Sequence, residues 1–191
     1  MARLIFQLLA IQLILVATSF GFFQTGSKIK EGTKYQLQQK VLTLGTSYTI
    51  KDNRDQPVYK VGFKQLGVGK HLQLTDPSGQ NEFYSIKHII NPFGLAKYEI
   101  RQNNQVIAEV NRKFNFLGGK KFSVNSKHGT YRIEGNFRSR EFKIKKDHAI
   151  VATISKKFFA IGDKYGVKVE KGQDVPFILC LAIVVDEVAH D

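Results

Sequence analysis

The stretch Val175-Pro-Phe-Ile-Leu-Cys-Leu-Ala-Ile-Val-Val185, close to the end of this chain of 191 residues, decides the expected fold. Asp174 directly before it can cap a helix, and Pro176 is tolerated in a first helical turn. Residues 177–185 are apolar on every side, so a helix here must be buried all round. The run is eleven residues long and ends at two acids, whereas a helix that spans a bilayer needs about 20 apolar residues. We therefore expect a helix over 175–188 inside the protein; a central strand is the alternative, because Ile and Val are abundant.

Ahead of this run, apolar and polar residues alternate with a period of two from 35 to 170. Tyr59, Val61 and Phe63, for example, alternate with lysine and glycine. This pattern is typical of a strand with one buried face and one wet face. The clearest runs are 59–63, 72–74, 98–100, 142–144 and 165–169.

Turn residues separate these runs. Segments 52–55, 76–79, 102–104, 127–129 and 146–147 each carry Asp, Asn or Gly. Successive runs lie too close together for crossover helices, which indicates antiparallel pairing. We predict a mainly β fold, in which a closed antiparallel barrel of about twelve strands encloses the buried C-terminal helix, since closure removes exposed sheet edges.

Residues 1–23 have the pattern of a targeting segment. Arg3 gives a positive start, an apolar run follows over 4–17, and small residues come next. A secretory signal peptide has these three parts, and cleavage would fall between Ser19 and Gly26. It would send the protein to the secretory pathway or outside the cell.

An uncleaved membrane anchor is the alternative for this segment, because 4–23 is just long enough to span a bilayer. The lysines that follow it would then keep the domain in the cytosol. Segment 24–34, rich in Gly, Ser, Thr and Lys, is expected to be a linker, which leaves 35–191 for the barrel domain.

Positive charge dominates the composition. The chain has 29 Lys and Arg against 16 Asp and Glu, a formal net charge of +13. Such a field attracts anions such as lipid headgroups, nucleic acid or acidic glycans, although charge can also serve solubility alone. Clusters in the second half of the chain are the candidate site for anionic lipid headgroups: Arg112, Lys113, Lys120, Lys121, Arg138, Arg140, Lys143, Lys145, Lys156 and Lys157.

Strand geometry assigns some of these residues to one surface. Lys143 and Lys145 alternate along a strand, so they share a face that points out of the barrel. Phe114, Phe116 and Phe122 lie near Lys120 and Lys121; exposed, they would suit a membrane interface, and otherwise they belong to the core.

No catalytic or cofactor site is predicted. The histidines are scattered singly without metal-ligand spacing, and the single cysteine, Cys180, lies in the apolar run, where a thiol is an inert hydrophobe. We therefore expect no enzyme, no metal and no cofactor.

An ordered series of motifs resembles the LURP-one-related family of the tubby C-terminal-like superfamily, which includes phospholipid scramblases. The series is Tyr48-Thr-Ile-Lys-Asp-Asn-Arg-Asp-Gln-Pro-Val-Tyr-Lys-Val61, Leu72-Gln-Leu-Thr-Asp-Pro-Ser-Gly79, Tyr131-Arg-Ile-Glu-Gly135, Ala149-Ile-Val-Ala-Thr-Ile-Ser-Lys-Lys157 and Asp163-Lys-Tyr-Gly-Val-Lys-Val169, followed by the apolar run.

The resemblance implies a twelve-stranded barrel threaded by its C-terminal helix. Tubby proteins bind phosphatidylinositol phosphates on a basic face, scramblases are membrane-associated, and plant members of the family are linked to pathogen defence. The calcium-linked acidic segment of scramblases has no counterpart here, since no run of alternating ligands is present. The usual members of the family also lack a signal peptide, so residues 1–23 depart from the pattern.

These observations predict a monomeric, non-enzymatic, basic module that binds anionic lipid headgroups, phosphoinositide-like in kind, at a membrane surface. A secreted or anchored structural or defence-related protein that acts through protein contacts is the alternative. A signal peptide and the lack of a basic platform interleaved with exposed aromatics argue against nucleic acid as a partner.

Overall fold

The structure, a computed structural model, describes residues 32–42, 45–64, 70–90, 96–113, 120–136, 138–155 and 164–190. The predicted targeting segment 1–23 lies outside these ranges. Twelve strands and one helix make up the described part of the chain: β1 (Thr33–Leu42), β2 (Gly45–Lys51), β3 (Pro57–Phe63), β4 (His71–Thr75), β5 (Glu82–Ile89), β6 (Lys97–Gln102), β7 (Gln105–Lys113), β8 (Lys120–Ser126), β9 (Gly129–Asn136), β10 (Glu141–Lys146), β11 (Ala149–Ser155), β12 (Lys164–Val169) and α2 (Val175–His190).

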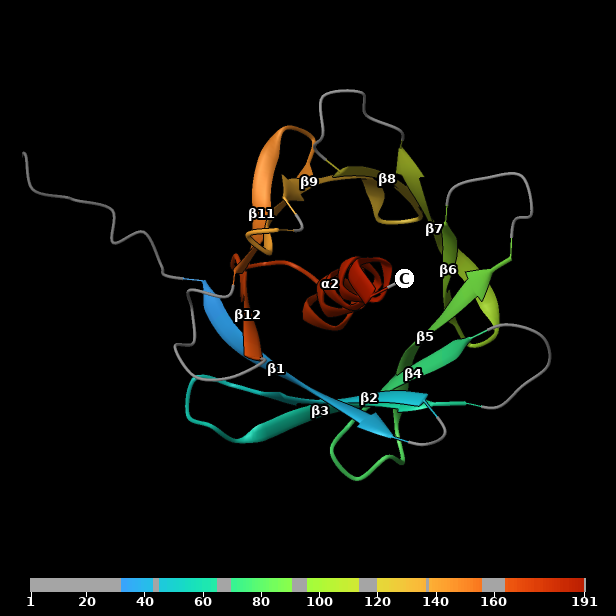
Figure 1. Cartoon of the computed structure of the whole chain (residues 1–191), viewed down its shortest axis with the longest axis vertical. Coiled ribbons are helices and arrows are strands. Elements are labelled where there is room, and N and C mark those ends of the chain that lie inside the picture. The colour runs from blue at the N-terminus through green and yellow to red at the C-terminus, as the bar shows by residue number, and fades with distance from the viewer. Residues whose placement is uncertain are drawn as a thin grey trace, which may run out of the picture. The chain divides into compact units, whose positions relative to one another are not determined.

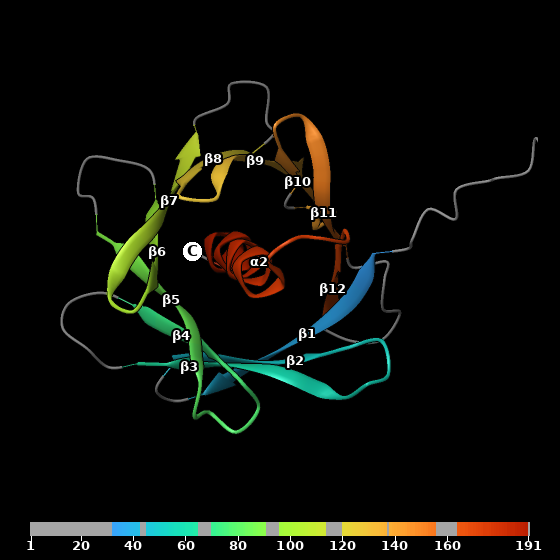
Figure 2. The same ribbon diagram turned by 180° about the vertical axis from the view of Figure 1, so that it is seen from behind.

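The twelve strands form a closed antiparallel barrel. Each strand pairs with its neighbours in sequence, and the first strand closes the ring by pairing with the last, with Leu37 of β1 opposite Tyr165 of β12. Figures 1 and 2 show the ring from its two sides, with α2 inside it. The predicted fold class is therefore confirmed. Thr33 and Lys34 belong to β1, although a linker was expected over 24–34.

Side-chain alternation explains how the ring buries its core. Val61, Ile100, Val124 and Ile144 are fully buried, and they point inward while polar neighbours point out. The apolar residues 177–184 of α2 are fully buried as well. The helix thus fills the barrel, and the alternative of a central strand is wrong. No helix within the described ranges is long and apolar enough to cross a membrane.

Asp174 fixes the start of α2. Its Oδ1 accepts a hydrogen bond from the backbone N–H of Phe177 at 3.0 Å, and its backbone carbonyl accepts one from Ile178 at 3.0 Å. The hydroxyl of Tyr84 donates to Asp174 Oδ2 at 2.6 Å, which ties the helix start to β5. The ring of Phe177 packs 5.5 Å from that of Tyr131. The expected helix cap is present, and α2 continues to His190.

The barrel has two ends that differ in their connections. We call the end that holds Asp174 the cap end and the end that holds Asp186 and Glu187 the carboxylate end. At the cap end the strands are joined by short turns, at 52–56, 76–81, 103–104, 127–128 and 147–148, and 170–174 leads into α2.

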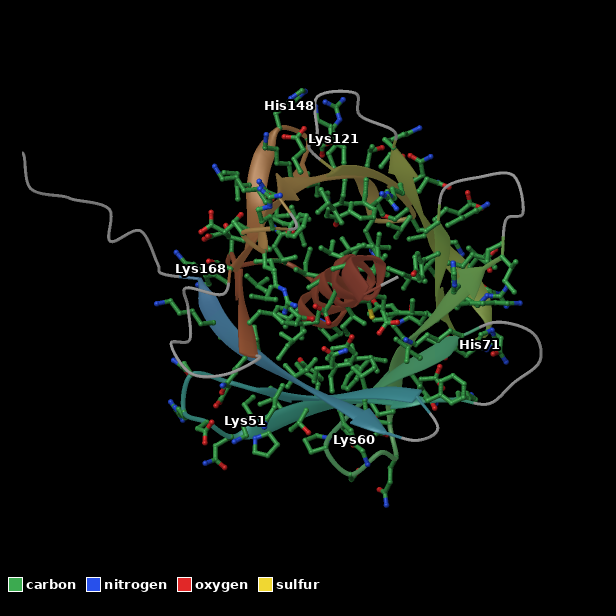
Figure 3. All side chains as sticks on the ribbon, viewed as in Figure 1. Lys51, Lys60, His71, Lys121, His148 and Lys168 are labelled. Atoms are coloured by element: carbon green, nitrogen blue, oxygen red, sulfur yellow. The ribbon has the colours of Figure 1, made fainter. Side chains whose placement is uncertain are left out.

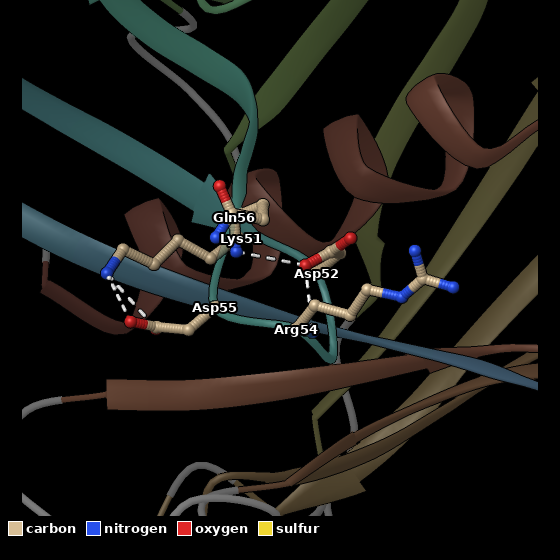
Figure 4. A network of polar contacts seen from close by, with 5 residues as sticks. All are labelled: Lys51, Asp52, Arg54, Asp55 and Gln56. Atoms are coloured by element: carbon tan, nitrogen blue, oxygen red, sulfur yellow. Dashed lines mark hydrogen bonds and ion pairs between the residues drawn. The ribbon is translucent and has the colours of Figure 1, made fainter.

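The β2–β3 turn shows how the cap end is built (Figure 4). Asp52 Oδ1 accepts hydrogen bonds from the backbone N–H groups of Arg54 at 2.9 Å and Gln56 at 3.0 Å, so the carboxylate closes the turn. Lys51 Nζ lies 3.0 Å from Asp55 Oδ2. The carboxylates of Asp52 and Asp55 are therefore both engaged within this turn.

Candidate anion-binding surface

The interior of the barrel leaves no room for a ligand of ordinary size within the described residues. Phe177, Leu181 and Val184 of α2 are fully buried against the wall. A cavity of about 10 Å³ remains at the carboxylate end, lined in part by Tyr165 and Asp186. This volume suits about one water molecule. Ligand binding is therefore expected on the outer surface.

A row of seven residues in register, five of them lysines, crosses the outer wall with one residue on each of seven neighbouring strands. Neighbouring strands lie about 4.8 Å apart, so six steps cover about 29 Å around the wall. The row runs diagonally, from the carboxylate end at β7 to the cap end at β1. In register order, the lysine row is Lys113, Lys121, Glu134, Lys143, Thr153, Lys168 and Lys34.

Three lysines of this row are free to meet an anion. Lys113, Lys121 and Lys143 are exposed and form no ion pair with an acid among the described residues. Figure 3 shows Lys121 and Lys168 on the outside of the ring. Lys168 Nζ lies 3.7 Å from Glu170, so its charge is partly balanced.

Glu134 is the single acid in the row. Lys145 Nζ donates to Glu134 Oε2 at 2.9 Å. This hydrogen bond and the charges of Lys145, Lys121 and Arg132 hold the pKa of Glu134 below its ordinary value, against the smaller effect of burial. Three cations therefore converge on one carboxylate, and an excess of positive charge is left around it.

Several charges of β6 and β7 outside the lysine row are paired with one another. Arg101 Nη2 lies 2.7 Å from Glu99 Oε2, and Lys97 Nζ lies 3.1 Å from Glu109 Oε1. Paired charges attract a further anion only weakly. These two ion pairs therefore add no excess positive charge beside the lysine row.

Two hollows border the lysine row. One, of about 160 Å³, is polar and is lined by Thr130, Arg132, Glu134, Lys145, Asp147 and His148. The other, of about 550 Å³, is shallow and mostly apolar, and Lys143, Thr153, Phe142 and Ile154 are among the residues that line it. The row therefore combines cationic, polar and apolar surface within a few strands.

Comparisons with known proteins agree with this architecture. The sequence pattern of the LURP-one-related family matches residues 33–186, which is most of the chain. The chain belongs to the LURP-one-related family. The family and the barrel indicate a binding module, and the resemblance predicted from the motif series is confirmed.

Relatives of this LURP-one-related chain occur in distant organisms. The protein YxjI of Bacillus subtilis (strain 168) is 28% identical over 155 residues, which cover 81% of this chain and 93% of YxjI. The X-ray structure of a protein from Arabidopsis thaliana matches with a TM-score of 0.59 at 19% identity, over 84% of this chain and 94% of that one. At this identity the second match shows the shared fold alone.

The LURP-one-related barrel brings together some of the basic residues predicted from the sequence. Lys113, Lys121 and Lys143 stand in the lysine row, and Lys145 stands beside it, bound to Glu134. Arg138 is exposed in the β9–β10 turn. Lys120 lies in β8, but its side chain is outside the described part of the structure, as are Lys156 and Lys157.

Two of the predicted residues face elsewhere. Arg112 is half-buried and stands opposite Phe122 in register, on the inward face of β7. Arg140 is half-buried, has a positive φ of 50°, and lines the small cavity with Tyr165 and Asp186. Neither shares the outer wall with the lysine row. Phe122 is 2% exposed and belongs to the core, while Phe114 and Phe116 lie outside the described residues.

The sequence prediction missed Arg132, Lys34 and Lys168. Arg132 is an isolated cation in sequence, although its alternation with Tyr131 and Ile133 places it on the outer face. Lys34 and Lys168 come opposite each other only because β1 pairs with β12. Because these two lysines are far apart in the sequence, a search for local clusters of charge does not find them.

At the carboxylate end of the LURP-one-related barrel, two acids of α2 are buried in a polar cluster. The hydroxyl of Tyr48 lies 3.0 Å from Asp186 Oδ2 and 2.8 Å from Glu187 Oε1, and Lys70 forms an ion pair with Glu187. Burial, together with the nearby Tyr165 and the two carboxylates, raises the pKa of Tyr48 far above its ordinary value, so the hydroxyl stays a donor. Lys70 balances the charge of Glu187, and Asp186 accepts a hydrogen bond from Tyr48. Among the described residues, no group of three or more His, Cys, Asp or Glu is placed to hold a metal ion.

Proposed function

We propose that this protein is a non-enzymatic, monomeric module that binds anionic lipid headgroups at a membrane surface through its lysine row. The observation that carries the proposal is the register-aligned set of Lys113, Lys121 and Lys143, which are exposed on β7, β8 and β10 and form no direct ion pair among the described residues. Glu134, which lies between Lys121 and Lys143, is already bound to Lys145. A filled barrel supports an outer-surface ligand, since the buried helix α2 occupies the interior.

The chemistry of lysine favours lipid charge over lipid identity. A lysine ammonium is a compact point charge, whereas arginine provides the planar fork that recognises one phosphate in fixed geometry. Each lysine near an anionic membrane contributes about 1 kcal/mol of binding free energy. Three such lysines give a modest, salt-sensitive affinity that increases with headgroup charge, so phosphoinositides should bind more tightly than phosphatidylserine.

Vesicle flotation tests the proposal. The purified domain is mixed with vesicles of phosphatidylcholine alone, of phosphatidylcholine with phosphatidylserine, and of phosphatidylcholine with a phosphoinositide, each at low and high salt. We expect flotation with both anionic vesicles, stronger with the phosphoinositide, and its loss at high salt, because screening shortens the reach of exposed charges. Equal flotation with neutral and anionic vesicles, or none at low salt, would refute the proposal.

Which membrane the module meets depends on the segment 1–23. We propose that it is a signal peptide that directs the protein to the secretory pathway, with a membrane anchor as the second possibility. Sequencing the N-terminus of the protein recovered from its cells distinguishes the two, since a start between Ser19 and Gly26 indicates cleavage and a start at Met1 or Ala2 indicates an anchor.

A further inference from the structure

The two ends of the barrel carry different charge. In the connections described at the cap end, six residues are acidic and three are basic. In those described at the carboxylate end, none is acidic, and the cations are Lys64, Lys70, Arg138 and Arg140. Lys64 pairs with Glu82 and Lys70 pairs with Glu187, so the excess positive charge described at this end comes from the two arginines. An anionic surface is thus attracted to the carboxylate end and repelled by the turns of the cap end.

The carboxylate end also exposes large apolar side chains. Ile90, just after β5, is 62% exposed, and Phe63, the last residue of β3, is 40% exposed. Backbone hydrogen bonds join the segments that carry these two residues. The N–H of Lys64 donates to the carbonyl of His71 at 2.9 Å, and the N–H of His88 donates to the carbonyl of Lys70 at 2.9 Å. Phe63 and Ile90 therefore stand at the same end of the barrel, near Lys64 and Lys70, whose charges are balanced by Glu82 and Glu187.

Asp186 and Glu187, which define the carboxylate end, do not repel an anionic membrane. Asp186 is 6% exposed and Glu187 is 4% exposed. The hydroxyl of Tyr48 reaches both, and Lys70 pairs with Glu187. Buried and compensated charges contribute little to the field outside the barrel.

The lysine row reaches the same end. Lys113 is the last residue of β7, and Lys121 is the second residue of β8, so both stand at the carboxylate end of the wall. Around the rim from β3 to β10, exposed apolar residues are thus followed by exposed cations. This order matches a membrane interface, where apolar side chains enter the boundary of the acyl chains and lysines meet the phosphates.

We infer that the barrel docks end-on, with its carboxylate end on an anionic bilayer and with Ile90 and Phe63 inserted into the interface. This orientation rests on the proposed lipid binding and adds to it which surface touches the membrane. The cap end, with its self-contained acidic turns, faces away from the bilayer. Lys113 and Lys121 contact headgroups at the rim, and Lys34 and Lys168 stay in water.

A single introduced tryptophan tests the orientation, because the chain contains none. Ile90→Trp places the probe at the carboxylate end. Ile150→Trp is the matched control, since Ile150 is 43% exposed and stands next to the β10–β11 turn of the cap end. Both positions are at the surface, so both variants should fold, and a far-UV spectrum checks this.

Each variant is mixed with phosphatidylcholine–phosphatidylserine vesicles that contain brominated acyl chains, and co-sedimentation is measured on the same samples. We expect both variants to sediment, with a blue shift and quenching of the emission for Ile90→Trp only. Sedimentation without quenching of Ile90→Trp, or quenching of Ile150→Trp instead, would overturn the orientation and leave lipid binding intact. Failure of the wild-type chain to sediment would overturn both.

Affinity provides a second readout. Ile90→Asp should weaken vesicle binding about tenfold, because a mostly exposed Ile loses its transfer into the interface. Ile150→Asp makes the same change in charge at the other end and should leave the affinity unchanged. Equal weakening by the two variants would contradict end-on docking.

Discussion

Removal of three charges from the lysine row should weaken membrane binding strongly. The change is the triple substitution Lys113→Ala, Lys121→Ala and Lys143→Ala. All three side chains are exposed, and Glu134, which lies between Lys121 and Lys143, keeps its hydrogen bond from Lys145, so no buried charge is left unpaired by the change. At about 1 kcal/mol for each lysine near an anionic surface, the loss is about 3 kcal/mol, on the order of 100-fold in affinity.

Titration with phosphatidylserine-containing vesicles at an ionic strength of about 0.15 M measures this loss. The matched control is Lys51→Ala, Lys60→Ala and Lys127→Ala, which removes the same total charge from positions outside the lysine row. Lys51 is already paired with Asp55, and Lys127 lies in a turn of the cap end. The control should lose less than about tenfold, because charges farther from the bilayer than a Debye length of about 8 Å are screened. Equal losses for the two triple variants would refute the role of the lysine row.

Three further predictions concern the fold. Asp174→Ala should lower the free energy of unfolding by about 1 kcal/mol, as for other lost helix caps, and an unchanged urea midpoint would contradict the capping role. Gly135→Ala should destabilise the barrel by about 1–3 kcal/mol, because an added Cβ overlaps the chain of β10, whereas Gly62→Ala, with nothing within 4 Å, should be close to neutral in the same assay. Hydrogen bonds from Ser78 and the β4–β5 turn lower the pKa of Asp76 to about 2, so its contribution to stability is complete above the ordinary pKa of a carboxyl and disappears as pH falls toward 2. A carbon-detected NMR titration that places the pKa of Asp76 near 4 would contradict this.

The barrel could be predicted because its pattern is local. Alternation in segments such as 59–63 and 142–144 reports one buried face wherever a strand lies, and short polar turns between them permit only antiparallel neighbours. The helix could be predicted for a different reason, since an apolar run too short for a bilayer can only be buried in protein. The closing pair, β1 with β12, is separated by most of the chain, and no local pattern specifies it.

The candidate site could be predicted only in part. Lys143 and Lys145 were placed correctly on the outer face by alternation. The same alternation in β7 places Arg112 on the inward face, together with Val110. The sequence prediction grouped Arg112 with its charged neighbours and did not apply the alternation. Phe63 has the phase of the buried Val61, and it is exposed because the strand ends there. Whether a residue reaches a membrane thus depends on its position along the strand as well as on the face of the sheet that it occupies.

The reactivity of the Cys180 thiol tests whether α2 fills the barrel. A filled barrel leaves only the outer surface for a ligand. Cys180 is the single cysteine of the chain and is fully buried, and burial raises the pKa of its thiol well above the ordinary value. A disulfide reagent such as Ellman's should therefore modify it no faster than the domain unfolds, while the exposed thiol of a Ser78→Cys variant reacts during mixing. Modification of Cys180 in the native domain as fast as at position 78 would place α2 outside the barrel and contradict this architecture.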